Sequence, residues 1–131
     1  MKIKHLIMTR WWMQPTGFTK TILDDEILDE RLNYLVNHLF VSLNNQTNHD
    51  FEFIVQVHPN HTNEQIEKIS VAMKNANPNF KASVMVWNDG FHNYVESLWK
   101  ENDIVLLTRI DDDDFVNKNA VQDTRDLIGN G

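Results

Sequence analysis

The chain has 131 residues, a formal net charge of −7 and no cysteine. Its acidic balance argues against a general nucleic-acid binder, which needs a basic surface. The lack of cysteine excludes a disulfide scaffold, a thiolate zinc site and a cysteine nucleophile. No apolar run approaches the roughly 20 residues of a membrane span, and no signal-peptide pattern follows Met1. We therefore expect one domain, residues 1–131, in the cytoplasm or peripheral to a membrane.

The first half of the chain predicts a strand, a helix and a second strand. Residues 4–9 read as a strand, and a loop over residues 10–21 follows it with the pair Trp11-Trp12. Leucines spaced by three or four residues over 28–43 predict an amphipathic helix whose leucine face packs on the core. Residues 51–58 predict a strand, with Phe51, Phe53, Val55 and Val57 on one face.

The second half repeats this alternation. Thr62 and Gln65 form a capping-box pattern at the start of a helix, and residues 82–87 predict a third strand. A short helix with an apolar face that includes Trp99 follows. Residues 104–110 predict a fourth strand, whose four consecutive apolar residues favour burial on both faces.

The final helix is expected around residues 120–128, with Leu127 on its apolar stripe. Strands and helices thus alternate throughout the chain. This order predicts an α/β domain with a mostly parallel sheet of about four strands and flanking helices.

The negative charge is concentrated near the end of the chain. Residues 101–131 hold eight acids and three bases, so they carry five of the seven net negative charges. Four of these acids are consecutive, Asp111 to Asp114, and they directly follow the fourth predicted strand. Ligands of open α/β sheets bind beyond the carboxyl ends of the strands. This acidic run is therefore the candidate for chemistry.

Adjacent carboxylates repel one another, and a divalent cation relieves that repulsion. Mg²⁺ and Mn²⁺ prefer oxygen ligands. Asp111 and Asp113 point the same way in an extended segment, whereas Asp112 points away or forms a local cap. Asp114 either caps the following helix or contacts the residues that bind the metal ion. The alternative is a solvated acidic loop that caps the final helix, but the position at a strand end beside Arg109 favours a metal or phosphate site.

Other acidic and phosphate-binding motifs do not fit the sequence. An EF-hand loop that began at Asp111 needs Gly at its sixth position and Glu at its twelfth, where this chain has Val116 and Gln122. The chain has four glycines and no glycine-rich phosphate loop.

Three segments carry a resemblance to a known family. Residues 108–114 (TRIDDDD), between a strand and a helix, resemble the D-x-D region of GT-A glycosyltransferases, and within them the bacterial rhamnosyltransferase-like group related to inverting family-2 enzymes. Residues 43–55 (LNNQTNHDFEFIV) are similar to the stretch that leads into the second strand of that group, and residues 5–10 to its opening strand. The resemblance implies the Rossmann-like, nucleotide-sugar-binding half of a GT-A enzyme.

The resemblance also implies residue roles. Asp113 ligates Mn²⁺ or Mg²⁺, Asp111 contacts the ribose or belongs to the metal shell, and Asp114 lies in or next to that shell. The ion binds the diphosphate of a nucleotide-sugar donor, and the sugar passes with inversion to a glycan or lipid-linked acceptor in polysaccharide biosynthesis. The residues implied to contact the donor are Thr9, Arg10, His58, Arg109, Asp111 and Asp112.

The sequence departs from the family pattern in two places. His58-Pro59 stands where many relatives carry an Asp that recognises the nucleobase of the donor. The general base that deprotonates the acceptor is expected downstream of the D-x-D, yet the chain ends about seventeen residues after Asp114. We therefore expect a donor-binding portion that lacks its C-terminal half or is completed by a partner chain. The alternative is a non-catalytic or degenerate α/β module that binds nucleotide and metal.

Overall fold

The computed structural model describes residues 1–11, 21–87 and 89–129. Most of the predicted loop after the first strand, including Trp12, lies outside the described residues. Within them, one sheet holds the strands β1 (Ile3–Arg10), β2 (Glu52–Val57), β3 (Lys81–Val86) and β4 (Ile104–Arg109). The strand order is β3-β2-β1-β4 and every neighbouring pair is parallel. The predicted α/β class with a parallel sheet is confirmed, and the arrangement is Rossmann-like.

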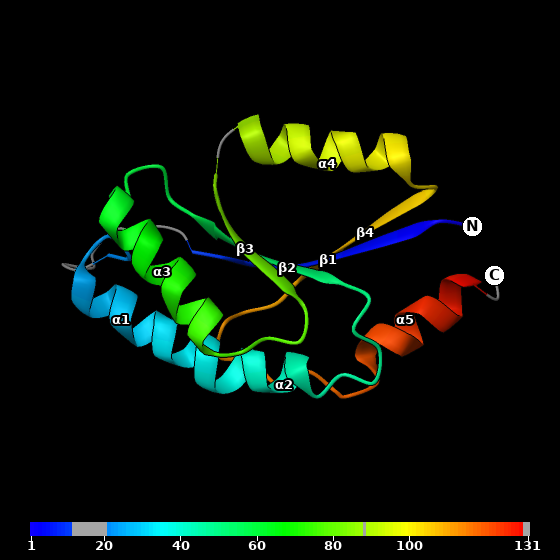
Figure 1. Ribbon diagram of the computed structural model, residues 1–131, viewed down its shortest axis with the longest axis horizontal. Helices are drawn as coiled ribbons and strands as arrows, with labels where there is room; N and C mark the ends of the chain where they lie inside the picture. The colour runs from blue at the N-terminus through cyan, green and yellow to red at the C-terminus, as the bar shows by residue number, and fades with distance from the viewer. Residues whose placement is uncertain (12–20, 88, 130–131) are drawn as a thin grey trace.

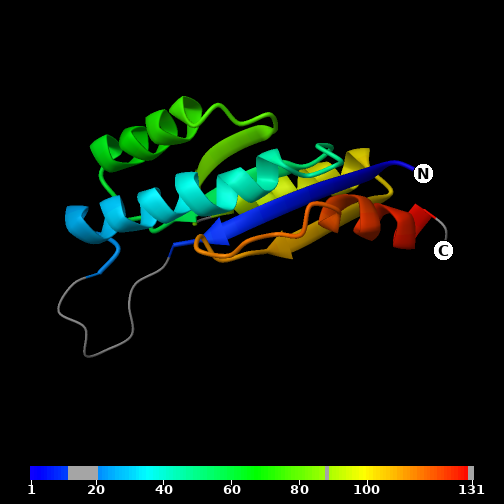
Figure 2. The ribbon, with the colours of Figure 1, turned by 90° about the horizontal axis from the view of Figure 1, so that it is seen from below.

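The helices are α1 (Asp25–Tyr34), the π-helical turn η1 (Leu35–Leu39), α2 (Phe40–Asn44), α3 (Asn63–Asn75), α4 (Asp89–Glu101) and α5 (Ala120–Gly129). Helices α1, α2 and α3 lie on one side of the sheet and α4 lies on the other (Figure 1). Turning the molecule shows α1 and α2 as one long rod that runs beside β1 (Figure 2).

The predicted leucine helix is confirmed, with a π-helical turn at its centre. Its five leucines, at positions 28, 32, 35, 39 and 43, are all buried in the larger of two core clusters. The smaller cluster lies under α4 and contains Leu6, Ile54, Val95 and Leu98. The capping box of α3 is also present, because the Thr62 hydroxyl accepts from the Gln65 N–H and the Gln65 side chain accepts from the Thr62 N–H.

The strand that is buried on both faces is β2 and not β4, which corrects the prediction from the apolar run. All six residues of β2 are buried, because β2 lies inside the sheet with helices on both sides. Strand β4 is an edge strand, and its Leu107 is 49% exposed. Trp99 in α4 and Leu127 in α5 were expected on apolar stripes, but they are 60% and 79% exposed.

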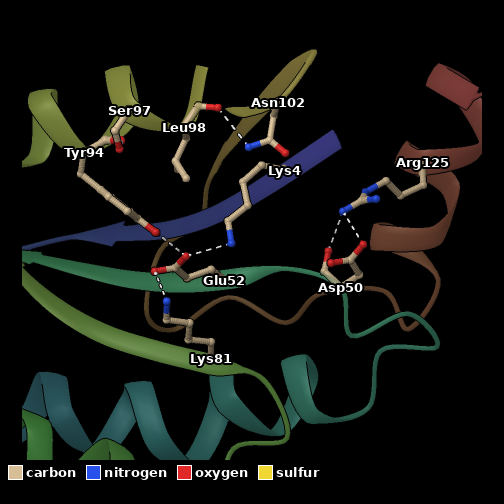
Figure 3. Close-up of polar contacts among 9 residues, drawn as sticks. All are labelled: Lys4, Asp50, Glu52, Lys81, Tyr94, Ser97, Leu98, Asn102 and Arg125. Carbon is tan, nitrogen blue, oxygen red and sulfur yellow. Dashed lines mark hydrogen bonds and ion pairs between the residues drawn. The ribbon is translucent and has the colours of Figure 1, made fainter. Parts of the chain in front are cut away.

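A buried carboxylate joins the strands near their amino ends. Glu52, at the start of β2, is 2% exposed and accepts a hydrogen bond of 2.6 Å from the Tyr94 hydroxyl of α4. The Lys4 ammonium of β1 lies 3.1 Å from the same carboxylate, and that of Lys81 in β3 lies 3.9 Å away (Figure 3). These contacts tie α4 to three strands at the end of the sheet opposite the acidic turn.

In the described part of the chain, no helix is both long enough and apolar enough to cross a membrane.

Candidate functional site

A pocket of about 300 Å³ lies where the carboxyl ends of β1 and β4 meet. Because these two strands are parallel neighbours, the residues after each strand come together at the same edge of the sheet. The lining residues are Thr9, Arg10, Trp11, Ile22, Arg31, Asp111, Asp112 and Asp113. The pocket thus holds five of the residues that the sequence predicted for the site.

The end of β1 is hydrogen-bonded to the residue that precedes the acidic turn. The Thr9 hydroxyl, which is buried, donates to the Ile110 carbonyl at 2.8 Å. The Ile110 N–H in turn donates to the Met8 carbonyl at 2.9 Å. Thr9 therefore positions the segment that follows β4, and its hydroxyl is already engaged in doing so.

Residues 111–114 form a tight turn. The Asp114 N–H donates to the Asp111 carbonyl at 3.1 Å, and the Asp114 carboxylate accepts from the Asp111 N–H at 3.2 Å. An i to i+3 bond of this kind defines a β-turn. The turn leaves the side chains of Asp111 and Asp113 exposed at the pocket, whereas that of Asp112 is buried.

Asp112 is the one member of the acidic run that points into the protein. Its carboxylate accepts a hydrogen bond of 2.9 Å from the Trp11 indole and one of 3.2 Å from the Arg31 guanidinium. Burial raises the pKa of Asp112, while the attraction of Arg31 and the two hydrogen bonds oppose that rise. The sequence prediction that Asp112 points away from Asp111 and Asp113 agrees with this arrangement.

Two arginines from different elements line the pocket. Arg10, at the end of β1, holds its guanidinium carbon 4.3 Å from the centre of the Trp87 ring, a cation–π distance. Arg31 comes from α1, and its guanidinium carbon lies 5.7 Å from the centre of the Tyr34 ring. The pocket therefore presents two guanidinium groups together with three carboxylates.

Three of the predicted site residues do not line this pocket. Arg109 is exposed at the end of β4, and Asp114 is bonded within its own turn. His58 follows β2, where its Nδ1 accepts from the Asn60 N–H at 3.0 Å. The predicted alternative that Asp114 caps the last helix is wrong, because α5 begins at Ala120. The donor contacts of Arg109 and His58 stay predictions.

The segment after the acidic turn is held by the loop that precedes β2. The buried Gln46 side chain donates to the Asn117 carbonyl at 2.7 Å and accepts from the Val121 N–H at 3.2 Å. The Thr47 N–H donates to the Lys118 carbonyl at 2.8 Å. The loop before β2, which belongs to the resemblance segment 43–55, therefore contacts the residues that connect the acidic turn to α5.

One further contact in this region involves Asp50 and Arg125. The Arg125 guanidinium of α5 donates to the Asp50 carbonyl at 2.7 Å and lies 3.1 Å from its carboxylate (Figure 3).

Sequence reasoning missed Arg31 and Ile22 as pocket residues and did not assign Trp11 to the site. Arg31 lies among charged residues on the polar side of a helix, so no local pattern distinguishes it. Its role depends on a contact with Asp112, 81 residues away in the sequence.

The donor set of the pocket is compatible with a hard divalent cation. Within the residues that the structure describes, no group of three or more His, Asp or Glu side chains is arranged to hold a metal. Mg²⁺ commonly uses only one or two protein carboxylates and completes its shell with water and substrate phosphates. The exposed pair Asp111 and Asp113 meets that requirement.

The fold and the pocket define an α/β protein of Rossmann-like arrangement with a polar ligand pocket at the carboxyl edge of its sheet. The family model described as "Putative rhamnosyl transferase" matches residues 18–130. The chain belongs to this family. No curated protein and no solved structure was found to match it.

Proposed function

We propose that the chain is the donor-binding part of a GT-A glycosyltransferase that binds a nucleotide-sugar through a divalent cation at Asp111 and Asp113. The observation that carries the proposal is the pocket itself. In a chain of the rhamnosyl transferase family, two exposed carboxylates and two arginines line one pocket at the sheet edge where open α/β folds bind ligands.

Asp111 and Asp113 are the proposed metal ligands, because both are exposed and both line the pocket. Asp114 is less suited to this role, since its carboxylate is bonded to the Asp111 N–H. A bound Mn²⁺ or Mg²⁺ supplies Lewis-acid stabilisation of the departing nucleoside diphosphate. Asp111 and Asp113 set the position of that ion in the pocket.

Arg10 is the proposed second contact for the donor. Its guanidinium is held against Trp87 and it lines the pocket. Thr9 contributes indirectly, by fixing the acidic turn through the Ile110 carbonyl. We assign no general base to the pocket carboxylates, because Asp111 and Asp113 serve the metal and Asp112 is engaged with Trp11 and Arg31.

Calorimetric titration tests this function. Uridine, guanosine and thymidine diphosphates are titrated into the chain with Mn²⁺, with Mg²⁺ and with EDTA. We expect binding of at least one nucleotide that requires the divalent ion. Asp113→Asn is expected to weaken it by about 10-fold or more, whereas the exposed Asp123→Asn in α5 leaves it unchanged.

Two results distinguish the proposed function from its alternatives. Absence of metal-dependent nucleotide binding by folded chain contradicts the proposed function. Binding without transfer or hydrolysis of any nucleotide-sugar favours the non-catalytic module.

A further inference from the structure

We propose that Arg31 is a second cationic group of the pocket, which binds the diphosphate of the donor in the same pocket as Asp111 and Asp113, and that Asp112 is the positioning residue that holds it there. This inference rests on the proposed function. It names a ligand contact in α1, an element to which neither the sequence nor the family match assigns a role.

The ion pair between Arg31 and Asp112 is asymmetric. The Asp112 side chain is 5% exposed, while that of Arg31 is 33% exposed and lines the pocket. The carboxylate is therefore the buried anchor, and the guanidinium is the part that a ligand can reach.

The contact between the two residues uses little of the guanidinium. It is a single hydrogen bond of 3.2 Å from one terminal nitrogen, and not the paired, bidentate geometry that arginine forms with a dedicated carboxylate partner. An arginine has five N–H donors. Among the residues that the structure describes, this is the one hydrogen bond that the Arg31 side chain makes, so side-chain donors remain for a phosphate oxygen.

Asp112 does not depend on Arg31 alone. The Trp11 indole donates the shorter bond, 2.9 Å, to the other carboxylate oxygen. Arg31 both bonds Asp112 and lines the pocket, so neutralising Asp112 does not account for its whole position. An arginine that is oriented by a buried carboxylate and by the Tyr34 ring is preorganised for an anionic ligand such as a phosphate group.

The charges of the pocket also favour a protein cation beside the bound anion. Asp111 and Asp113 repel an incoming diphosphate until a metal ion neutralises them. Arg31 gives the diphosphate a fixed positive partner that belongs to the protein. A metal ion at Asp111 and Asp113 and the Arg31 guanidinium would then both bind the anion.

The test compares two probes, Mn²⁺ alone and inorganic pyrophosphate in the presence of saturating Mn²⁺, by calorimetry. In Arg31→Gln we expect pyrophosphate affinity to fall about 10- to 100-fold, the loss of one or two charge-assisted hydrogen bonds. Affinity for Mn²⁺ alone is expected to stay equal or rise, because a positive charge leaves an acidic pocket. Lys118→Gln removes the same charge from an exposed position that does not line the pocket, and is expected to change neither affinity.

The double variant Arg31→Gln with Asp112→Asn separates ligand binding from a purely structural role. It removes the buried charge together with its partner and keeps neutral hydrogen-bonding groups at both positions. If Arg31 binds the anion, the double variant stays as weak toward pyrophosphate as Arg31→Gln. Recovery of wild-type pyrophosphate affinity in the double variant overturns the inference, as does an Arg31→Gln affinity within about twofold of wild type.

The same titrations distinguish the two proposals. If the wild-type chain binds pyrophosphate with Mn²⁺ and Arg31→Gln binds it equally well, the Arg31 inference fails and the metal-dependent donor site stands. If the wild-type chain binds pyrophosphate equally well with EDTA and the Arg31→Gln variant does not bind it, the role of Arg31 stands and the role of the metal ion fails. If the wild-type chain binds no pyrophosphate, both fail.

Discussion

The Trp11 indole N–H donates a hydrogen bond of 2.9 Å to the Asp112 carboxylate, which joins the end of β1 to the turn after β4. Both residues are buried. Phe in place of Trp11 keeps most of the apolar packing and removes the donor. We expect Trp11→Phe to lower the free energy of unfolding by about 2 kcal/mol, because a buried carboxylate loses a partner.

Urea denaturation followed by circular dichroism measures this change. Trp99→Phe is the matched control, since Trp99 is 60% exposed and surface substitutions usually change stability by about 0.5 kcal/mol or less. Equal stability of the two variants contradicts a structural role for the Trp11–Asp112 bond.

Gln46 is expected to control the order of the segment that follows the acidic turn. Glu at this position keeps the oxygen that accepts from the Val121 N–H but loses the donor to the Asn117 carbonyl. It also places a charge at a position that is 3% exposed. We expect Gln46→Glu to cost about 1–3 kcal/mol and to speed amide hydrogen exchange over residues 111–125.

Hydrogen exchange followed by mass spectrometry makes the measurement, with the exposed Asn93→Asp on α4 as the control for an amide-to-acid change. If exchange over residues 111–125 is the same in Gln46→Glu as in wild type, Gln46 does not hold that segment.

Glu52 is expected to interact more strongly with Tyr94 than with Lys81. The hydroxyl of Tyr94 bonds the buried carboxylate at 2.6 Å, and burial together with this bond raises the pKa of Tyr94, so the hydroxyl remains a donor. The Lys81 ammonium is 3.9 Å away on a side chain that is 71% exposed. A double-mutant cycle with Glu52→Gln and Tyr94→Phe should give a coupling of about 1–2 kcal/mol. The cycle with Lys81→Met should give about 0.5 kcal/mol or less, and a larger coupling to Lys81 than to Tyr94 contradicts this ranking.

His5 makes the stability of the fold depend on pH. Burial lowers the pKa of this imidazole, the positive charge of Arg125 lowers it further, and Asp50 partly opposes them. The folded state then binds fewer protons at His5 than the unfolded state, in which the pKa is about 6.5. The contribution of neutral His5 is therefore complete above a pH of about 6.5 and is lost as the pH falls from there through the folded-state pKa.

The measurement is the urea midpoint at several pH values between about 5 and 7.5, the range in which histidine titrates. We expect His5→Gln to show a smaller loss of stability on acidification than wild type, while the exposed His92→Gln on α4 retains the wild-type pH dependence. His61, whose pKa burial also lowers, remains in both variants. Parallel pH profiles for wild type and His5→Gln would show that His5 is not responsible.

The sequence was sufficient for the elements with strong local signals. The leucine spacing of α1 to α2 and the capping box of α3 depend on neighbours within a turn or two of helix, so both were predictable. The burial of β4 was mispredicted because an apolar run carries no information about strand order. Only the pairing β3-β2-β1-β4 places β4 at the edge and β2 inside.

The place of Asp111 and Asp113 at the pocket was predictable, because both follow a strand directly. Arg31 and the partners of Asp112 were not, because their contacts join residues 81 and 101 positions apart. The same holds for Gln46, whose sequence motif was visible while its contact with Asn117, 71 residues away, was not.

The central claim, that Asp111 and Asp113 hold a divalent ion in the pocket at the ends of β1 and β4, is tested most directly by paramagnetic broadening. Mn²⁺ is added at sub-stoichiometric amounts to isotope-labelled chain with and without uridine diphosphate, and Mg²⁺ serves as the diamagnetic reference. We predict selective loss of the amide resonances of residues 9–11 and 111–113, enhanced by the nucleotide and abolished in Asp113→Asn. Broadening that is centred elsewhere, or that is unchanged in Asp113→Asn, would contradict the claim.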